Sequence, residues 1–430
     1  MPEASPPRVG RLSAVGRAFR HRNYRLFFAG QLVSLIGTWT QSLAQTWLVY
    51  RLTGSPLLLG TVTFCQQTPV FLFATLGGMV ADRLPRRSVL VVTQSTAMTL
   101  AFILSGLTLS GAVRVGHILV MASLLGVVNA FDIPTRQAFV GQMVGKDDLM
   151  NAIALNSSMV NGARILGPAI AGLLVQALGE GWCFFINGVS FLAVIAGLLG
   201  MRDLPATPAT TDREPALTRV ANGFRFVMRE RRIRALLMLF ALTALAGMPY
   251  STLMPIYAKE VFHGDARTLG ILMGAVGFGA LGGGLTLASR SEMRGTDTWV
   301  NIACGTFGAC LVLFALSRTF WLSILVLVPL GASMMTQLSA TNTRVQMMTP
   351  DELRGRVMAI WAMIFMGFAP FGSLLAGWLA TSIGPSETLI AGGSLCIVGA
   401  SAFAIWLPKL RAESRNARLV RQAALPADHL

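Results

Sequence analysis

The sequence predicts an all-α polytopic membrane protein with twelve transmembrane helices in two six-helix bundles. Of its 430 residues, 53% are hydrophobic and 13% are charged, whereas a soluble globular protein carries about 25% charged residues. The apolar residues form long runs, and the basic residues fall in short groups between those runs. This pattern favours a chain that crosses a membrane many times over a water-soluble fold.

Twelve apolar runs are long enough to cross a membrane. A spanning helix needs about 20 mostly apolar residues, because the hydrocarbon core is about 30 Å thick. Six runs precede a polar stretch, and six follow it. The runs lie near 26–49, 57–80, 89–109, 116–140, 151–178 and 182–201, and then near 235–258, 268–288, 299–316, 320–343, 357–383 and 388–407.

These runs divide the chain into five expected regions. They are an N-terminal segment, a first six-helix bundle, a linker, a second six-helix bundle and a basic tail: 1–25, 26–201, 202–234, 235–407 and 408–430. Within the linker, residues 217–234 form a basic amphipathic stretch. Such a stretch is predicted to lie on an anionic membrane surface.

The positions of the basic residues predict the orientation. Most of the 35 lysines and arginines fall in segments that lie on one side of the membrane if both termini do. The other side holds Arg51, Arg114, Lys259, Arg267 and Arg318. Because cytoplasmic loops carry the excess of basic residues, we expect both termini in the cytoplasm and a bacterial inner-membrane location.

Composition also excludes several functions. The net charge of +16 would suit nucleic acid if the basic residues gathered on one soluble face, but they are spread between apolar runs. The five cysteines are scattered, without the spacing of a disulfide framework or metal site. No His/Asp, Ser/His or Cys/His set lies in the apolar runs, so we expect no enzyme, cofactor or metal. The expected partners are a small-molecule substrate, membrane lipid and a proton as coupling ion, and we expect a monomer.

The two halves show weak internal similarity. Thr135-Arg136 is followed by an acidic pair before a leucine, and Thr343-Arg344 is followed by another such pair. Each pair leads into a helix of small residues that ends in Ala-Gly. A duplicated six-helix unit predicts this similarity.

A short loop after the second apolar run carries the strongest motif. It reads GGMVADRLPRR from Gly77 to Arg87. On physical grounds alone it suits a tight turn with a helix-capping aspartate and a cytoplasmic basic cluster. Its pattern, Gly-x-x-x-Asp-Arg-x-x-Arg-Arg, resembles the signature loop of the major facilitator superfamily, although Pro85 stands where a glycine is usual.

The resemblance implies a charge relay that locks the two halves together on the cytoplasmic side. Its candidate residues are Asp82, Arg83, Arg86, Arg87, Asp132, Arg136, Arg354 and Arg356. Asp132 is the only acid that we expect inside a span, so it needs a partner such as Arg86 or Arg136. Both a gating role and direct proton handling stay open for Asp132.

The fifth apolar run contains ARILGPAIAG, from Ala163 to Gly172. Small residues at this spacing allow helices to approach closely, and a proline inside a helix loosens it. The string also resembles the antiporter motif of the superfamily, which is linked with export. The motif positions are Ala163, Gly167, Pro168, Ala171 and Gly172.

Arg164 lies near the middle of that run. A lipid-facing arginine there would be costly, so it should face a central cavity. It is expected to neutralise an anionic substrate or to pair with Asp132 or with backbone carbonyls. The other candidates for the cavity lining are Gln31, Gln41, Gln45, Gln66, Trp39 and Trp361.

The resemblance extends over essentially the whole chain, to a twelve-helix branch with enterobactin and other siderophore exporters, macrolide efflux proteins and drug-efflux relatives. It implies efflux of a small amphipathic drug or siderophore by alternating access, driven by the proton-motive force. Two alternatives stay open. One is a flippase for lysophospholipid or another lipid, and the other is a transport-inactive sensor or scaffold.

Overall fold

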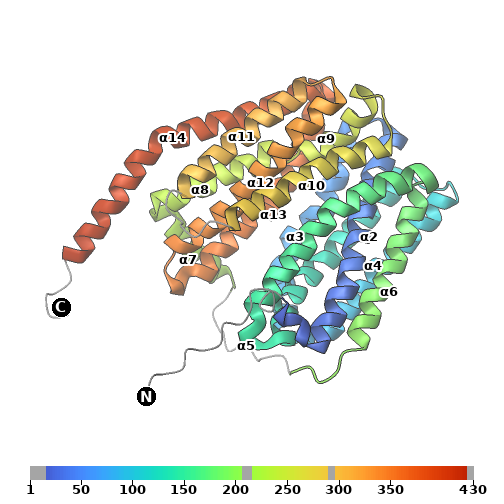
Figure 1. Ribbon diagram of the computed structural model, residues 1–430, viewed down its shortest axis with the longest axis horizontal. Coiled ribbons are helices and arrows are strands. Elements are labelled where there is room, and N and C mark those ends of the chain that lie inside the picture. Colours follow the sequence, from blue (N-terminus) through green and yellow to red (C-terminus); the bar gives the residue numbers. More distant parts are fainter. Residues whose placement is uncertain (1–15, 206–215, 289–295, 424–430) are drawn as a thin grey trace, which may run out of the picture. The chain divides into compact units, whose positions relative to one another are not determined.

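A computed structural model describes residues 16–205, 216–288 and 296–423. Within these ranges every regular element is a helix (Figure 1). The predicted all-α class is therefore confirmed.

The first repeat contains a 3₁₀ turn and five long helices. Their bounds are η1 (Arg17–Arg20), α2 (Arg22–Thr53), α3 (Pro56–Arg83), α4 (Arg86–Leu109), α5 (Val115–Leu178) and α6 (Glu180–Leu199). Helix α5 holds two spans, because the backbone breaks at Gly145 with φ 73° and ψ −179°. A positive φ is easily adopted only by glycine, so Gly145 permits the turn between the two spans.

The second repeat is preceded by α7 (Ala216–Arg229). Its other elements are α8 (Arg231–Leu242), η2 (Thr243–Gly247), α9 (Tyr250–Ile256), η3 (Tyr257–Val261), α10 (Ala266–Ala288), α11 (Thr296–Leu316), α12 (Phe320–Met348), α13 (Asp351–Ser382) and α14 (Pro385–Ala423). The segment from α8 to η3 is one interrupted span in which η2 and η3 are π-helical turns. Pro249 and Pro255 lie in this span and lack the N–H that a regular helix needs.

Eleven stretches of the described chain are long and apolar enough to cross a membrane, and they match eleven of the predicted runs. The remaining predicted run is α2, which is 32 residues long. Glutamines such as Gln31, Gln41 and Gln45 lower its mean hydropathy. With α2 included, the count of twelve spans agrees with the prediction.

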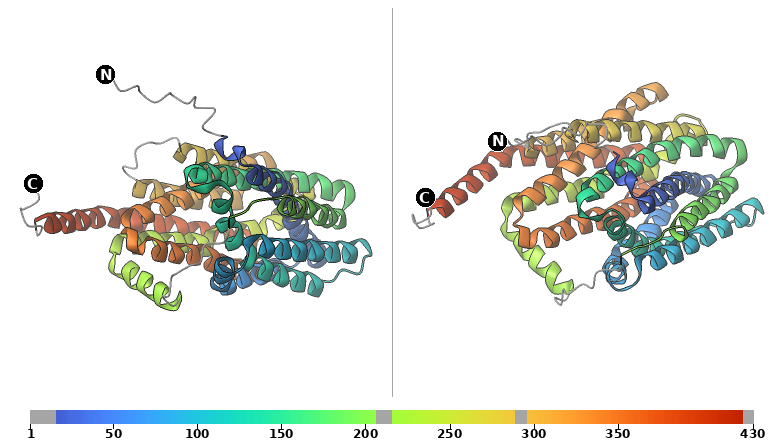
Figure 2. Two further views of the ribbon diagram at one scale, coloured as in Figure 1. Left: turned by 90° about the horizontal axis from the view of Figure 1, so that it is seen from below. Right: turned by 60° about the horizontal axis from the view of Figure 1, so that its bottom comes forward.

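The chain folds as two compact units. Unit 1 comprises residues 1–45 and 72–211, and unit 2 comprises residues 46–71 and 212–430. In unit 1, α4 packs against α5 and α6. In unit 2, α10 packs on α12 and α11 packs on both α12 and α14. Figure 2 shows the end of α14 extending beyond the other helices of unit 2.

The end of α2 and the beginning of α3 belong to unit 2, although they come from the first repeat. A Cβ on Gly377 of α13 would lie 2.6 Å from the carbonyl oxygen of Pro56, so the two helices touch through backbone. Nearby, Phe64 packs edge-on against Phe371 with ring centroids 5.4 Å apart. Tyr50 donates a hydrogen bond to Glu260 of η3. These residues join α2 and α3 to α13 and η3, and together they are called the α2–α3 contact.

Helix α7 accounts for most of the predicted amphipathic stretch, and Arg231 to Arg234 begin α8 instead. One face of α7 packs on α13, because Val227 is buried in a cluster with Val357 and Ile360. Phe224 and Met228 of α7 are 56% and 47% exposed. Membrane binding by these two exposed side chains stays a prediction.

Candidate functional site

The motif loop spans the end of α3 and the start of α4. A Cβ on Gly77 would overlap the carbonyl oxygen of Ala130, so this glycine lets α3 approach α5 closely. Arg86 donates to the carbonyl oxygens of Ala81 (3.1 Å) and Ala138 (3.2 Å). Arg87 donates to the carbonyl oxygen of Leu199 at the end of α6 (2.8 Å). The basic cluster therefore binds backbone carbonyls of several helices.

Asp132 is buried in α5 and 4% exposed. Its Oδ1 accepts hydrogen bonds from Thr93 Oγ1 (2.9 Å) and Gln94 Nε2 (2.8 Å), both on α4. Its Oδ2 lies 3.7 Å from Nε of Arg136, one turn along the same helix. Of the two partners predicted for Asp132, the structure places Arg136 beside it.

The predicted relay is not assembled within unit 1. Arg86 binds carbonyls instead of Asp132, and exposed Asp82 has no hydrogen-bond or ion-pair partner among the described residues. Arg83 is also exposed. In unit 2, Arg354 pairs with Asp351, and the backbone of Arg356 lies against Gly223 of α7. A relay that joins the two repeats stays a prediction.

The antiporter-type motif forms a tight contact between α5 and α2. A Cβ on Gly167 would overlap Cβ of Trp39, so the glycine admits the tryptophan. Thr40 Oγ1 donates to the carbonyl oxygen of Gly167 (3.3 Å). The other motif residues, Ala163, Pro168, Ala171 and Gly172, are buried as well. Ala163 packs in a cluster with Leu35 of α2, so small residues at two turns of α5 let it approach α2 closely.

Arg164 lies against Trp39 at this contact. Its guanidinium carbon is 5.2 Å from the centroid of the Trp39 ring, which is a cation–π geometry. Arg164 is half-buried. Gly167 thus fixes Trp39, and the face of Trp39 orients the guanidinium.

Three of the predicted glutamines are buried in α2. Gln31, Gln41 and Gln45 are 3%, 7% and 5% exposed. Gln41 Oε1 accepts a hydrogen bond from Asn187 Nδ2 of α6 (2.7 Å), so its amide takes part in helix packing. Gln66 in α3 is half-buried. Contact of these glutamines with a substrate stays a prediction.

Trp361 of α13 belongs to an aromatic stack in unit 2. Its ring is nearly parallel to that of Phe240, at 2° and 5.5 Å, and it also stacks on Phe365. Its Nε1 is buried and has no hydrogen-bond partner within the described part of the chain. Trp361 therefore packs against two aromatic rings, and its indole N–H remains as a possible hydrogen-bond donor.

Two further buried carboxylates, Glu180 and Asp297, were not predicted; Glu180 lies in the first turn of α6. Asp297 precedes the predicted run near 299–316, but it lies in the first turn of α11 and is 1% exposed. It accepts a bond from Arg344 Nε (2.8 Å) and forms an ion pair with Arg232. The expectation that Asp132 is the only acid inside a span is therefore wrong, because the candidate span Thr296–Leu316 includes Asp297. The matching Thr-Arg pairs could have revealed it, since Arg344 needs a partner equivalent to that of Arg136.

No group of three or more His, Cys, Asp or Glu side chains that could hold a metal ion occurs in the described ranges. The geometry instead presents buried, oriented charges on spanning helices.

Sequence comparison decides the family. A family model described as "Transmembrane secretion effector", a branch of the major facilitator superfamily, matches residues 15–427. The chain belongs to this superfamily. It is therefore a transporter and not an enzyme, as predicted. It takes a small-molecule substrate and lies in a membrane.

Two relatives match most of its length. The chain is 27% identical to the staphyloferrin A transporter of Staphylococcus aureus over 398 residues, covering 91% of this chain and 98% of that protein. It is 25% identical to the enterobactin exporter EntS of Shigella boydii, covering 88% and 90%.

Solved transporters share its fold. The crystal structure of the nucleoside transporter NupG matches with a TM-score of 0.69 and 15% identity, covering 90% of this chain and 98% of NupG. A bacterial homologue of the lysosomal transporter Spinster matches with a TM-score of 0.67 and 13% identity, covering 91% and 96%. These similarities concern the fold.

Proposed function

We propose that this transporter exports a small anionic molecule of the siderophore class from the cytoplasm, by alternating access coupled to proton entry. The observation that carries the proposal is Arg164 stacked on Trp39 within an export-type motif. Two relatives support it, since one is a staphyloferrin A transporter and the other an enterobactin exporter. The proposal includes a bacterial inner-membrane location with both termini in the cytoplasm.

Arg164 is the proposed contact for the anionic part of the substrate. A guanidinium inside a span is costly unless it is paired or faces an aqueous cavity. Stacking on Trp39 holds its plane in a fixed orientation while N–H donors at its edge can reach a carboxylate or phenolate. Loss of the positive charge should therefore weaken anion transport.

Asp132 is the proposed proton carrier. A carboxyl that binds Thr93 and Gln94 keeps these neutral partners when it gains a proton, because a hydroxyl can reverse its bond direction. Protonation leaves a single guanidinium, that of Arg136, without its counter-charge. Loss of the proton would restore the negative charge of Asp132 and its ion pair with Arg136, and would complete the cycle.

The α2–α3 contact is the part of the molecule that alternating access must open. It joins helices of the first repeat to α13 and η3 through backbone, aromatic and hydrogen-bond contacts. Rocking of the two repeats requires that these contacts separate and re-form. In the proposed topology they lie on the outer side of the membrane.

The experiment uses inside-out vesicles that carry the full-length protein. With an imposed pH gradient, staphyloferrin A or enterobactin should accumulate, and without the gradient accumulation should fall to that of empty vesicles. Arg164→Gln should lower the transport rate at least tenfold, whereas Arg267→Gln, which removes an exposed arginine, should leave it unchanged. Equal accumulation with and without the gradient would show that proton antiport is wrong.

The same vesicles separate the two alternatives. Transport of lysophospholipid without transport of either siderophore would favour a flippase. Failure to move any of the three compounds, by protein with intact thermal stability, would favour a transport-inactive sensor or scaffold.

A further inference from the structure

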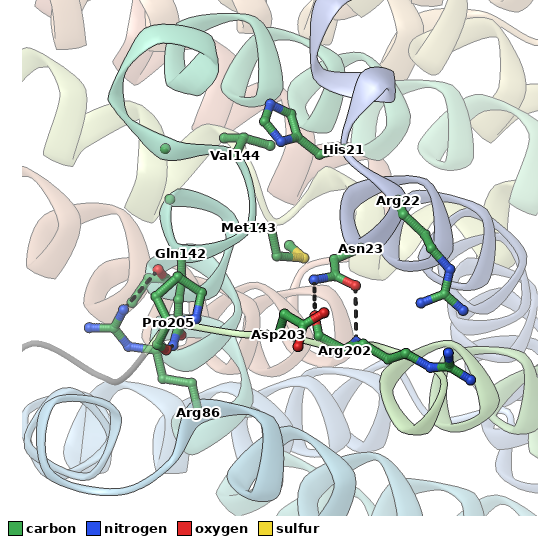
Figure 3. Close-up of a pocket in the computed structure, with 13 residues that line it drawn as sticks. His21, Arg22, Asn23, Arg86, Gln142, Met143, Val144, Arg202, Asp203 and Pro205 are labelled. Carbon is green, nitrogen blue, oxygen red and sulfur yellow. Dashed lines mark hydrogen bonds between the residues drawn. The ribbon is translucent and has the colours of Figure 1, made fainter.

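A cavity of about 870 Å³ lies at the end of unit 1 where α2 and α4 begin and α6 ends (Figure 3). Three arginines line it from three different parts of the chain: Arg22, Arg86 and Arg202. Asn23, Gln142 and His21 add further polar groups. Helix ends of a spanning bundle lie near the lipid headgroups, so the cavity opens at headgroup depth.

Most of the arginine N–H groups in this cavity have no acceptor among the residues that the structure describes. A guanidinium carries five N–H groups. Arg202 donates none of its side-chain N–H groups to another described residue, and Arg22 uses Nη1 for the carbonyl oxygen of Gly200 (3.1 Å). Arg86 uses Nε and Nη1 for two carbonyls. Each guanidinium thus keeps N–H groups that an anion can accept.

The charges in the lining do not cancel. Asp203 is the one carboxylate among the lining residues, against three guanidinium groups. The neighbouring carboxylate of Asp148 is engaged with His21 (3.0 Å) and lies 3.9 Å from Arg17. The cavity is therefore positively charged.

The wall that carries Arg202 is held in place. The Asn23 side chain makes two hydrogen bonds with the backbone of Arg202. Its Nδ2 donates to the carbonyl oxygen (2.7 Å), and its Oδ1 accepts from the N–H (3.2 Å). Gln142 donates to the carbonyl oxygen of Pro205, while its own Oε1 is buried and has no hydrogen-bond partner in the described ranges. Figure 3 shows Asn23 bridging to Arg202 at the centre of the view. The site is thus built before any ligand binds.

We propose that this cavity binds the phosphate-bearing headgroup of an anionic phospholipid. Guanidinium groups match phosphate oxygens in charge and geometry. Basic pockets between spanning helices at the membrane surface recognise anionic headgroups in this way. The position at headgroup depth favours a lipid phosphate over a soluble one. This site is separate from Arg164 and does not depend on the direction of transport.

The test uses the purified full-length protein in a neutral detergent. Native mass spectrometry counts bound lipid while phosphatidylglycerol or phosphatidylcholine is titrated, and thermal stability is followed in parallel. Phosphatidylglycerol should bind and stabilise the protein, and phosphatidylcholine should not. Arg202→Gln should weaken phosphatidylglycerol binding about fivefold, since one basic residue near the surface contributes about that factor.

Two further variants keep the result decisive. Arg22→Gln combined with Arg202→Gln should weaken binding further, and Arg267→Gln, with the same change in charge at a different helix start, should not. Unchanged phosphatidylglycerol binding in the double variant would overturn the proposal. Equal stabilisation by inorganic phosphate alone would also overturn it, because it would assign the cavity to soluble anions.

Discussion

In each repeat of this transporter, a buried carboxylate lies beside an arginine that follows threonine, but the two sites are built differently. In the first repeat, Arg136 pairs with Asp132 on its own helix, and the other bonds to this acid come from neutral side chains. In the second repeat, Arg344 reaches across to Asp297 on α11, and Arg232 of α8 adds a second positive charge. The two arginines occupy equivalent positions in the repeats, but the acid lies on the same helix in the first repeat and on a different helix in the second.

This difference predicts that protonation costs less free energy at Asp132 than at Asp297. Neutralising Asp132 leaves one guanidinium without a counter-charge, and that of Arg136 is 22% exposed. Neutralising Asp297 leaves two, those of Arg232 and Arg344, which are 14% and 18% exposed. We therefore infer that Asp297 ties α8, α11 and α12 together, while Asp132 is available for the transport cycle.

The largest effect is expected from Asp297→Asn. Removal of one member of a buried charge cluster costs about 3–5 kcal/mol, because the remaining charges stay buried without compensation. The free energy of unfolding in mixed detergent micelles should fall by that amount. Asp351→Asn, which changes an acid with an 84% exposed side chain, is the matched control and should cost under about 1 kcal/mol. Similar losses for the two variants would contradict a structural role for Asp297.

The equivalent arginines give the next test. Arg344→Gln removes a 2.8 Å charged hydrogen bond and should cost about 1.5–3 kcal/mol. Arg136→Gln removes a looser contact of 3.7 Å, and Asp132 keeps its hydrogen bonds from Thr93 and Gln94, so the loss should be smaller, about 1 kcal/mol. Both values come from the same unfolding titration. A larger loss for Arg136→Gln would reverse the comparison.

A smaller change in stability is expected from Asp132→Asn. The asparagine side chain can still accept from Thr93 and Gln94, so the loss should be about 1–2 kcal/mol. Thermal unfolding of the purified variant measures it, with Asp297→Asn alongside. A loss as large as that of Asp297→Asn would show that the two acids are equally structural.

The smallest effect is expected from Arg354→Gln. Its pair with Asp351 is exposed, with side chains 49% and 84% accessible, and exposed pairs contribute about 0–1 kcal/mol. Stability should hardly change. If the relay predicted from the signature loop forms during transport, this variant should slow transport without unfolding the protein, and a normal rate would argue against that role.

The sequence predicted those features that depend on local pattern. Spanning helices need only length and apolar composition, so all twelve could be found. The Asp132–Arg136 pair follows from helical spacing, because residues four apart lie on one face. Gly77 and Gly167 were found as parts of motifs. The atoms that pack against them, the carbonyl oxygen of Ala130 and Cβ of Trp39, are known only from the packed helices.

Features that depend on tertiary packing could not be predicted in this way. The site of Asp297 brings together residues 232, 297 and 344 from three helices, and the acid lies just outside the apolar run. Arg86 was predicted to bind a carboxylate, but two backbone carbonyls accept hydrogen bonds from it instead. Trp361 was placed in the cavity lining by residue type alone; its stacking with Phe240 and Phe365 depends on how α13 packs on α8 and was not predicted.

Proton coupling through Asp132 is tested most directly in proteoliposomes that carry wild-type protein or Asp132→Asn. Two measurements are made on each preparation: exchange of staphyloferrin A or enterobactin at equal pH, and accumulation driven by a pH gradient. We expect Asp132→Asn to retain exchange but no longer to respond to the gradient. Gradient-driven accumulation at the wild-type level in Asp132→Asn would contradict it.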